Sequence, residues 1–333
     1  MKIVIVGLGV IGGSYAMALK NAGYEDVYGI DTNTETLRKA KEMGIIKEGY
    51  VEGKEVIREA DIIILGIYPN LIKSFIENNK HNFKDGAIIN DVTGIKELFI
   101  DEVLSILPEN IDFVFGHPMA GREKKGIEYA SDEVFKGANY LITITEKNKE
   151  ANIEIIKNIV YDLGFSHIKI ITPKYHDEMI GFTSQLPHAL AVALINSDEE
   201  GRDTGSFIGD SYRDLTRIAN INESLWSQLF LGNKKNLLKS MKAFENEFNK
   251  RFKDTYILYI KEDFIKSGLM GNGKQHRKID DFIGNYVAIA VSDTIIALEN
   301  YSNMERKRKS EKKSTHCGLT RNEMLVPVIA FEI

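Results

Sequence analysis

Two of the seven histidines stand where an ordered run of the chain meets a loop or a helix. His117 follows the apolar run IDFVFG and opens HPMAGRE, and His188 lies in SQLPHALA. An imidazole titrates near neutral pH, so either side chain can accept a proton from a substrate hydroxyl. Both remain open to the ordinary interpretation of a loop or core residue. The other histidines lie in mostly polar stretches and receive no role: His81, His167, His176, His276 and His316.

A second group of residues offers positive charge to an anion. In GDSYRDLTRIA, Arg213, Asp214 and Arg217 fall at positions i, i+1 and i+4 of a predicted helix, so the two arginines share a face. A guanidinium presents a fork of N–H donors that matches a carboxylate with two hydrogen bonds. The alternative is a salt bridge between Asp214 and Arg217, and spacing does not decide between the two.

The glycines near the start of the chain have the spacing of a dinucleotide-binding loop. Gly7, Gly9 and Gly12 form G-x-G-x-x-G directly after an apolar run and before a predicted helix. The first glycine allows a tight turn, the second lets the backbone approach a pyrophosphate, and the third lets helix and strand pack closely. The helix N-terminus then offers N–H groups to the phosphates. The predicted loop residues are Gly7, Leu8, Gly9, Val10, Ile11 and Gly12.

Asp31 ends the second predicted strand, about 20 residues after the glycines, where this loop type has an acidic residue. A carboxylate there can accept both ribose hydroxyls and repels a 2′-phosphate, so the sequence favours NAD over NADP. The alternative is a turn without a ligand, with Asp31 capping the next helix. Tyr68 and Pro69 follow the third strand and either line the cofactor pocket or form a simple turn.

Alternating strands and helices position these residues. Strands are predicted at residues 2–7, 26–31, 60–67, 86–92, 112–116, 139–144 and 165–172, with helices such as 12–23 and 33–44 between them. This alternation predicts an α/β fold, a Rossmann-type parallel sheet with helices on both faces, over residues 1–172.

The pattern changes at Pro173. Up to about Tyr301 the apolar residues recur at helical spacing, which predicts a helical substrate and dimerisation domain over residues 173–301. Long apolar helices with little sheet to cover often pack against a second copy, so we expect a homodimer. The tail, residues 302–333, joins the charge run ERKRKSEKK to an apolar end, and its role is open.

Composition limits the class of protein. The 333 residues have room for about two domains, and 43% of them are hydrophobic. A net charge of −5 gives no reason to expect nucleic acid or an anionic membrane as partner. A single cysteine, Cys317, excludes an internal disulfide framework, and we expect no metal and a reducing, cytoplasmic setting. The apolar N-terminus is interrupted by glycines and does not read as a signal peptide or a membrane span.

Six stretches resemble, in order and approximate spacing, the prephenate dehydrogenase family, which includes arogenate dehydrogenases: GLGVIGGS, DVTGIK, HPMAGRE, TSQLPHALA, YRDLTRIA and NESLW. The resemblance covers roughly residues 1 to 260. It implies a Rossmann domain followed by a helical dimerisation domain. It also implies NAD-dependent oxidative decarboxylation of prephenate to 4-hydroxyphenylpyruvate in tyrosine biosynthesis.

The resemblance also implies roles for individual residues. His117 resembles the catalytic histidine that hydrogen-bonds the ring hydroxyl of prephenate, and His188 resembles a second active-site histidine. Arg217 resembles the arginine that binds a substrate carboxylate. Three further residues match positions that shape that pocket or lie near its entrance: Asp214, Trp226 and Glu123.

One position departs from the family pattern. Members often carry a serine near the catalytic histidine, in a D-x-x-S-x-K stretch, and here that position is Gly94 in DVTGIK. The neighbouring hydroxyl of Thr93 is the candidate to replace it. The C-terminal residues also show no regulatory ligand-binding module of the kind that some members append.

Alternative functions stay open. Prephenate and arogenate differ by one keto or amino group, which the sequence does not resolve. A β-hydroxyacid dehydrogenase would share the layout, but such enzymes generally use a lysine in the helical domain. A protein that senses NAD without chemistry would explain the glycine loop but not His117, His188 and Arg217 together.

Overall fold

The computed structural model describes residues 1–121, 124–252, 256–267 and 286–290. The chain divides into two compact units, Met1–Ser240 and Met241–Ile333. The boundary expected after residue 172 falls between a strand and a helix inside the first unit. The predicted nucleotide domain and the first helices of the predicted helical domain therefore pack together as one unit.

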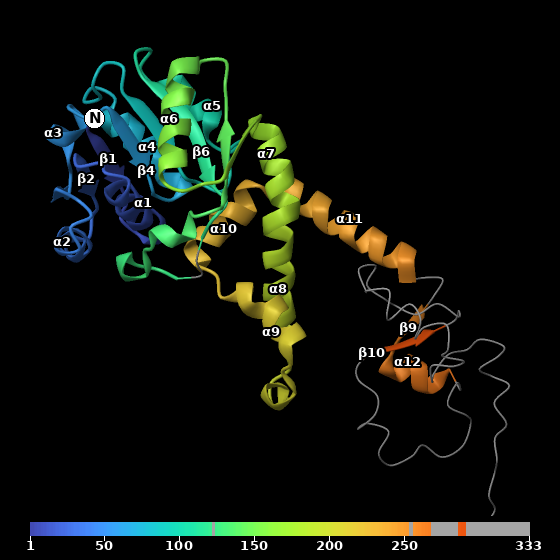
Figure 1. Cartoon of the computed structure of the whole chain (residues 1–333). Coiled ribbons are helices and arrows are strands. Elements are labelled where there is room, and N and C mark those ends of the chain that lie inside the picture. The colour runs from blue at the N-terminus through green and yellow to red at the C-terminus, as the bar shows by residue number, and fades with distance from the viewer. Residues whose placement is uncertain (122–123, 253–255, 268–285, 291–333) are drawn as a thin grey trace, which may run out of the picture. The chain divides into compact units, whose positions relative to one another are not determined.

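An eight-stranded sheet forms the centre of the first unit, in the order β3-β2-β1-β4-β5-β6-β7-β8 (Figure 1). The strands from β3 to β6 run parallel, β7 is antiparallel to β6, and β8 runs parallel to β7. Their bounds are β1 (Ile3–Val6), β2 (Val27–Ile30), β3 (Glu48–Tyr50), β4 (Ile62–Leu65), β5 (Ile88–Asp91), β6 (Asp112–Pro118), β7 (Asn139–Thr143) and β8 (His167–Ile171).

Two features of the sheet differ from the prediction. The short strand β3 was not expected, because its three residues, EGY, are too few to show a periodic pattern. The direction of β7 was also not expected. In the described residues between β6 and β7 the chain forms only the 3₁₀ turns η1 (Ile127–Tyr129) and η2 (Asp132–Val134). A parallel connection needs a crossover of a dozen or more residues, usually a helix, and without one the strand returns antiparallel.

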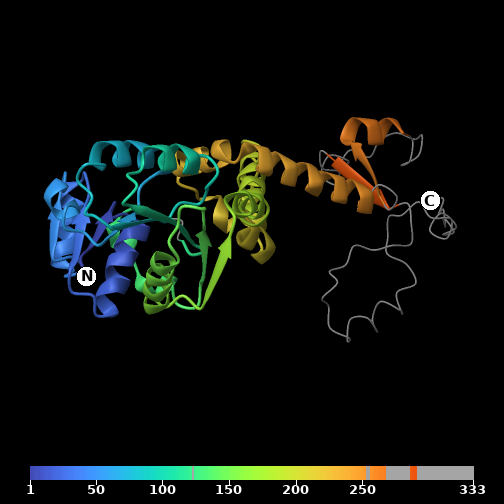
Figure 2. The same cartoon turned by 90° about the horizontal axis from the view of Figure 1, so that it is seen from above.

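Helices cover both faces of the sheet, as predicted. Buried residues of α1 (Val10–Asn21), α2 (Thr34–Glu42) and α6 (Glu150–Asp162) form one core with the sheet. Those of α3 (Lys54–Ile57), α4 (Pro69–Asn79) and α5 (Ile100–Ile106) form the other. Figure 2 shows α4 on one side of the sheet and α1 and α6 on the other.

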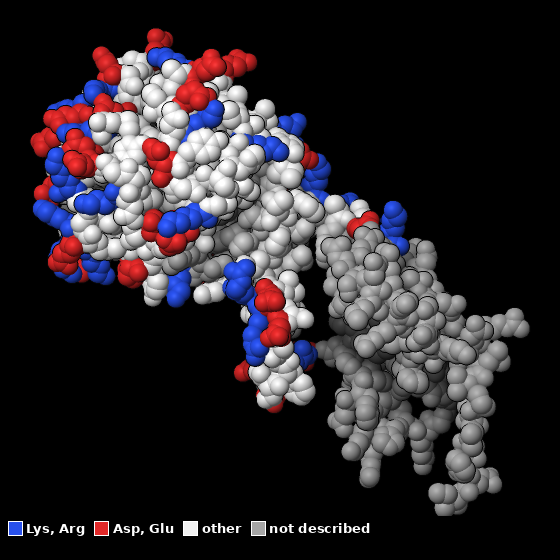
Figure 3. All heavy atoms as spheres, viewed as in Figure 1, with Lys and Arg blue, Asp and Glu red and all other residues white. Residues whose placement is uncertain are grey.

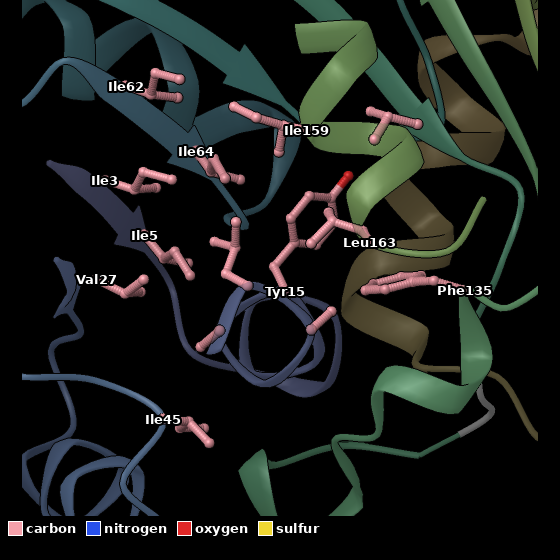
Figure 4. Close-up of a cluster of buried hydrophobic side chains, with 14 of the residues drawn as sticks. Ile3, Ile5, Tyr15, Val27, Ile45, Ile62, Ile64, Phe135, Ile159 and Leu163 are labelled. Atoms are coloured by element: carbon pink, nitrogen blue, oxygen red, sulfur yellow. The ribbon is translucent and has the colours of Figure 1, made fainter. Parts of the chain in front are cut away.

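The sequence of β1 explains why both faces are covered. Ile3 and Ile5 point into one core, and Val4 and Val6 point into the other, because side chains alternate along a strand. Tyr15 of α1 lies among the side chains of β1, β4 and α6 (Figure 4). A strand buried on both faces must be apolar at every position, which is the pattern expected of a parallel sheet.

The helical part of the first unit starts directly after β8. The segments α7 (Pro173–Ile180), η3 (Gly181–Gln185) and α8 (Leu186–Asn196) follow one another without a break, and η3 is a π-helical turn. The remaining elements are η4 (Thr204–Phe207), α9 (Asp210–Thr216), η5 (Arg217–Ala219), α10 (Glu223–Gly232) and α11 (Lys234–Phe252), which continues into the second unit.

The described part of the second unit includes β9 (Tyr256–Ile260), α12 (Lys261–Lys266) and β10 (Tyr286–Ala290), and the two strands pair antiparallel. The helical domain predicted over residues 173–301 is therefore wrong for Tyr256–Ile260 and Tyr286–Ala290. Aromatic and β-branched residues favour a strand there once a pairing partner is present. The predicted tail, residues 302–333, lies outside the described residues.

Charged side chains of both signs are interspersed over the first unit on the face shown in Figure 3, in keeping with the small net charge. None of the helices in the described part of the chain is long and apolar enough to cross a membrane.

Candidate active site

The glycine loop joins β1 to α1 at the carboxyl edge of the sheet. Gly7 has a φ of +86°, which favours glycine. A Cβ atom added to Gly12 would lie 1.8 Å from the Gly7 carbonyl oxygen, so helix and loop pack too closely for any side chain. A Cβ on Gly9 would meet nothing within 4 Å. Gly9 therefore borders open space, as the approach of a pyrophosphate requires.

Asp31 follows β2 and lies beside this loop. Its carboxylate accepts hydrogen bonds from the backbone N–H of Leu8 (2.8 Å) and of Asn33 (2.9 Å). The cap of α2 is Asn33, whose side chain accepts from the Glu35 N–H at 2.9 Å. Asp31 is thus not the helix cap that the alternative interpretation required, and its carboxylate is held next to the predicted phosphate loop.

Tyr68 and Pro69 connect the same edge of the sheet to α10. Tyr68 precedes α4, and Pro69 is its first residue and is buried. The Tyr68 hydroxyl accepts a hydrogen bond from the Asn222 side-chain amide at 2.9 Å, and the Asn70 N–H donates to the Gln228 side chain at 3.2 Å. The start of α10 is therefore attached to the loop that follows β4.

His117 lies near the end of β6, and the backbone of Gly116 before it is held by a buried ion pair. The Lys96 ammonium lies 2.5 Å from the Asp91 carboxylate, and both side chains are fully buried. The Gly116 carbonyl accepts from Lys96 (2.7 Å), and the Gly116 N–H donates to Asp91 (3.1 Å). Both polar groups of the residue before His117 are therefore fixed by side chains. Burial lowers the pKa of Lys96, and Asp91 opposes that effect.

Thr93 belongs to this ion pair and not to the histidine. Its hydroxyl lies within hydrogen-bonding distance of the Asp91 carboxylate and 3.0 Å from the Ile95 carbonyl oxygen, and it lies 3.2 Å from the Lys96 ammonium. A hydroxyl has a single proton to donate, and both acceptors lie inside the buried cluster. The expected replacement of the serine by Thr93 is therefore not supported.

Gly94 itself faces the imidazole. A Cβ atom at this position would lie 3.6 Å from His117 Nε2 and 3.5 Å from a methyl group of Leu229 on α10. Both distances are ordinary van der Waals contacts. A serine side chain at this position of the family pattern would thus point toward Nε2 of His117, whereas Gly94 has no side chain.

His176 contacts the other nitrogen of His117, a contact that was not expected from the sequence. His117 Nδ1 lies 2.8 Å from His176 Nε2, and His176 Nδ1 lies 2.7 Å from Asp177 Oδ1. His176 is fully buried, so its assignment to polar surroundings is wrong. The signal was present in the sequence PKYHDEMI, where Ile180 shares a helix face with His176, but one turn of helix is too short to display it.

Burial and neighbouring charge keep both rings neutral. The pKa of His117 is held well below its ordinary value by burial, by His176 and by the Lys96 charge, and that of His176 by burial and by Lys96. Burial raises the pKa of Asp177 to about 6, although the backbone N–H groups of Glu97 and Lys96 oppose that shift. At pH 7 the triad therefore holds two neutral imidazoles and one carboxylate.

His188 lies where η3 meets α8. Its Nδ1 donates to the Ser184 carbonyl at 2.8 Å. The ring stacks on Trp226 of α10, with centroids 3.9 Å apart. Ser184 lies in the π-helical turn η3, where the regular backbone hydrogen bonding is disturbed, and its carbonyl also serves the histidine side chain.

Arg217 follows α9 as the first residue of η5, which packs against α8. Its side chain is exposed, as is that of Asp214, whereas Arg213 pairs with Asp210 at 3.1 Å. Arg217 is the C-cap of α9, and its backbone N–H donates to the Arg213 carbonyl, so the two arginines lie one helical turn apart as predicted. Glu123 lies outside the described residues.

Helix α10 connects the predicted residues. Leu229 packs beside Gly94, Asn222 binds Tyr68, and Trp226 stacks on His188. The proton acceptor His117 and the second histidine, His188, are thereby linked to the loops at the carboxyl edge. So is η5, the element that carries Arg217. In the described residues no cluster of His, Cys, Asp and Glu could hold a metal ion. The arrangement suits proton transfer beside a dinucleotide.

Two family models match the chain consecutively. The nucleotide-binding domain of prephenate dehydrogenase matches residues 15–169, and the dimerization domain of prephenate dehydrogenase matches residues 172–257. A prephenate dehydrogenase of Bacillus subtilis is 29% identical over 257 residues, which cover 74% of this chain and 68% of the relative.

Solved structures agree with these matches. The chain is 30% identical to a prephenate dehydrogenase of Aquifex aeolicus in complex with hydroxyphenyl propionate and NAD+, with a TM-score of 0.69 over 80% of this chain and 92% of the other. It is 28% identical to the arogenate dehydrogenase of Synechocystis, with a TM-score of 0.64 over 75% and 90%. The nucleotide-binding fold, the consecutive family matches and these relatives lead to one conclusion: the chain belongs to the prephenate dehydrogenase family of oxidoreductases.

Proposed function

We propose that the chain oxidises and decarboxylates prephenate to 4-hydroxyphenylpyruvate with NAD+, a step of tyrosine biosynthesis. One observation carries the proposal. His117 lies at the carboxyl end of β6, on the edge of the sheet that also bears the glycine loop, with its Nε2 directed at Gly94 and α10. Ligands of open α/β sheets bind at this edge, close to the point where the strand order reverses.

The residues fit NAD as the cofactor. Gly9 leaves room for a pyrophosphate, the N-terminus of α1 faces that space, and Asp31 supplies a carboxylate for ribose hydroxyls at the end of β2. When bound, NAD+ supplies the acceptor for a hydride.

His117 handles the proton of the reaction. Prephenate carries a hydroxyl and a hydrogen on ring carbon C4 and a carboxylate on C1. As the hydride leaves C4, the C–O bond gains double-bond character, and His117 Nε2 accepts the hydroxyl proton. When CO2 leaves C1, its bonding electrons make the ring aromatic, and the proton returns to the same oxygen. The reaction therefore needs no net proton acceptor, and proton transfer of this kind contributes roughly 10²–10⁴-fold to the rate.

Positive and polar groups hold the dianionic substrate. Arg217 binds one carboxylate with two hydrogen bonds, because its planar guanidinium matches that geometry. His188, stacked on Trp226 with its Nδ1 bonded to the Ser184 carbonyl, donates from Nε2 to the second carboxylate in its protonated form. Arogenate, which carries an amino group in place of the keto group, is the second candidate, since one of the solved relatives is an arogenate dehydrogenase.

One assay tests these proposals together. The protein is incubated with NAD+ and either prephenate, arogenate or a β-hydroxyacid, and NADH formation is followed by its absorbance. Turnover of prephenate with a kcat/KM at least tenfold above that of arogenate supports the first proposal, and the reverse ratio supports the second. Absence of NADH with both cyclohexadienes refutes both.

A further inference from the structure

The contacts of His176 determine which nitrogen of His117 carries a proton. Asp177 accepts backbone N–H bonds on both oxygens, from Lys96 to Oδ1 and from Glu97 to Oδ2, each at 2.8 Å. Oδ1 is therefore an acceptor toward His176 as well, so His176 Nδ1 donates to it. A neutral imidazole has only one N–H, which leaves the lone pair of His176 on Nε2.

His176 fixes the tautomer of His117 in turn. His176 Nε2 can only accept, and it lies 2.8 Å from His117 Nδ1. His117 must therefore be protonated on Nδ1 and carry its lone pair on Nε2, the nitrogen that faces Gly94. The opposite tautomer of His117 would place two lone pairs against each other in a buried site, which is costly.

We propose that His176, itself held by Asp177, is a positioning residue that keeps His117 in the tautomer whose Nε2 accepts the substrate proton. The inference rests on the proposed function of His117. The role of His176 also accounts for the absence of the family serine. Because Gly94 has no side chain, the orientation of His117 is set by His176, which contacts its Nδ1. The proton stays on His117 and returns to the substrate oxygen, so no transfer through His176 is required.

Two substitutions of His176 separate positioning from simple space filling. In His176→Gln the amide N–H can donate to Asp177 while the amide oxygen accepts from His117, so the tautomer is kept. In His176→Leu the volume is similar, but the acceptor is lost. We expect kcat to fall less than about tenfold in the first variant and at least about 10²-fold in the second, with KM for prephenate changed little in either. His81→Leu, at an exposed histidine, is the control and leaves kcat unchanged.

The tautomer can be read without any turnover. In protein with ¹⁵N-labelled histidine, the ring ¹⁵N–¹H correlations distinguish Nδ1–H from Nε2–H, and the signal that His117→Asn removes identifies His117. We expect Nδ1–H for His117 in the wild type and in His176→Gln, and a change of protonation pattern in His176→Leu.

These outcomes keep the inference separate from the proposed function. An Nε2–H tautomer in the wild type, or a normal kcat in His176→Leu, would overturn the role of His176. Equal losses of kcat in the Gln and Leu variants would do the same, because a purely structural residue predicts no rescue. Failure to turn over prephenate and arogenate would refute the proposed function, while the spectra would still report the tautomer.

Discussion

The chemistry of His117 depends on its being neutral and directed. Its pKa is held well below the ordinary value, so the ring is unprotonated at physiological pH and able to accept a proton. The backbone of Gly116 is fixed by Lys96 and Asp91, which limits where the imidazole can move.

Replacing this imidazole tests its role directly. For His117→Asn we expect kcat to fall by at least about 10²-fold with little change in KM, because the group acts on the proton and not on substrate binding. Steady-state kinetics at saturating NAD+ measure both constants. A variant with near-normal kcat would remove His117 from the mechanism.

Arg217 should show the opposite kinetic signature. Its proposed partner is a carboxylate that is present in substrate and transition state alike, so Arg217→Ala removes binding that is uniform across the reaction. We expect a large rise in KM for prephenate and a smaller loss of kcat. Arg213→Ala, at the neighbouring arginine that pairs with Asp210, is the matched control. An unchanged KM in the Arg217 variant would contradict the binding role.

Gly9 offers a test of the cofactor loop that leaves the fold intact. A Cβ at Gly9 meets no protein atom within 4 Å, whereas one at Gly12 would lie 1.8 Å from a backbone oxygen. Gly9→Ala should therefore fold with a normal Tm but bind NAD+ at least about tenfold more weakly, because its methyl group occupies the phosphate approach. Gly12→Ala should lower Tm sharply. Unaltered NAD+ affinity in Gly9→Ala, measured by calorimetry, would place the pyrophosphate elsewhere.

The sequence could nominate some site residues and not others for a physical reason. Gly7, Gly9, Gly12 and Asp31 lie in one βαβ unit, so their spacing along the chain reflects their spacing in the fold. His176 reaches His117 only through tertiary packing, from 59 residues away. Thr93 could be noticed as a hydroxyl near Gly94, but its direction depends on a buried ion pair that no local pattern reveals.

At the level of elements, the junction of β5 and β6 depends on the Lys96–Asp91 pair. Both groups are fully buried, and removing one partner leaves an uncompensated charge, at a cost of about 3–5 kcal/mol. We expect Lys96→Met to lower the free energy of unfolding by that amount, as measured by denaturant titration.

A surface pair supplies the control for this prediction. Lys84→Met removes a partner of Asp61 in an ion pair whose side chains are 47% and 36% exposed. Exposed pairs contribute about 1 kcal/mol or less, so this variant should be nearly as stable as the wild type. Equal losses of the free energy of unfolding in the two variants would mean that the buried pair contributes no more to stability than the exposed pair.

Long periodic segments were predicted best. Apart from the three-residue β3, the strands of the parallel sheet and α1 and α2 were visible because each is apolar or amphipathic over its whole length. The antiparallel direction of β7 and the strand β10 were missed because direction and pairing depend on partners elsewhere in the chain. The π-helical turn η3 lies within a stretch correctly predicted as helical, but its widened hydrogen bonding has no periodic signature.

At the level of the whole molecule, we propose that the chain forms a homodimer through its helical part. Residues 172–257 match a family model described as a dimerization domain. Large apolar side chains of this segment lie on the surface of the single chain: Phe182 is 58% exposed, Leu231 72% and Leu238 52%. Several exposed apolar residues in one region are typical of a surface that associates.

The association can be broken selectively. Light scattering of the wild type at micromolar concentration should give twice the chain mass of 37.6 kDa. Leu231→Lys places a charge where a buried leucine would contribute about 1.5–3 kcal/mol per subunit, so it should raise the dimer dissociation constant at least about tenfold. Val51→Lys replaces a 49% exposed valine outside the helical part and should leave the dimer intact. A monomeric wild type would refute the dimer, whereas equal effects of the two substitutions would place the interface elsewhere on the chain.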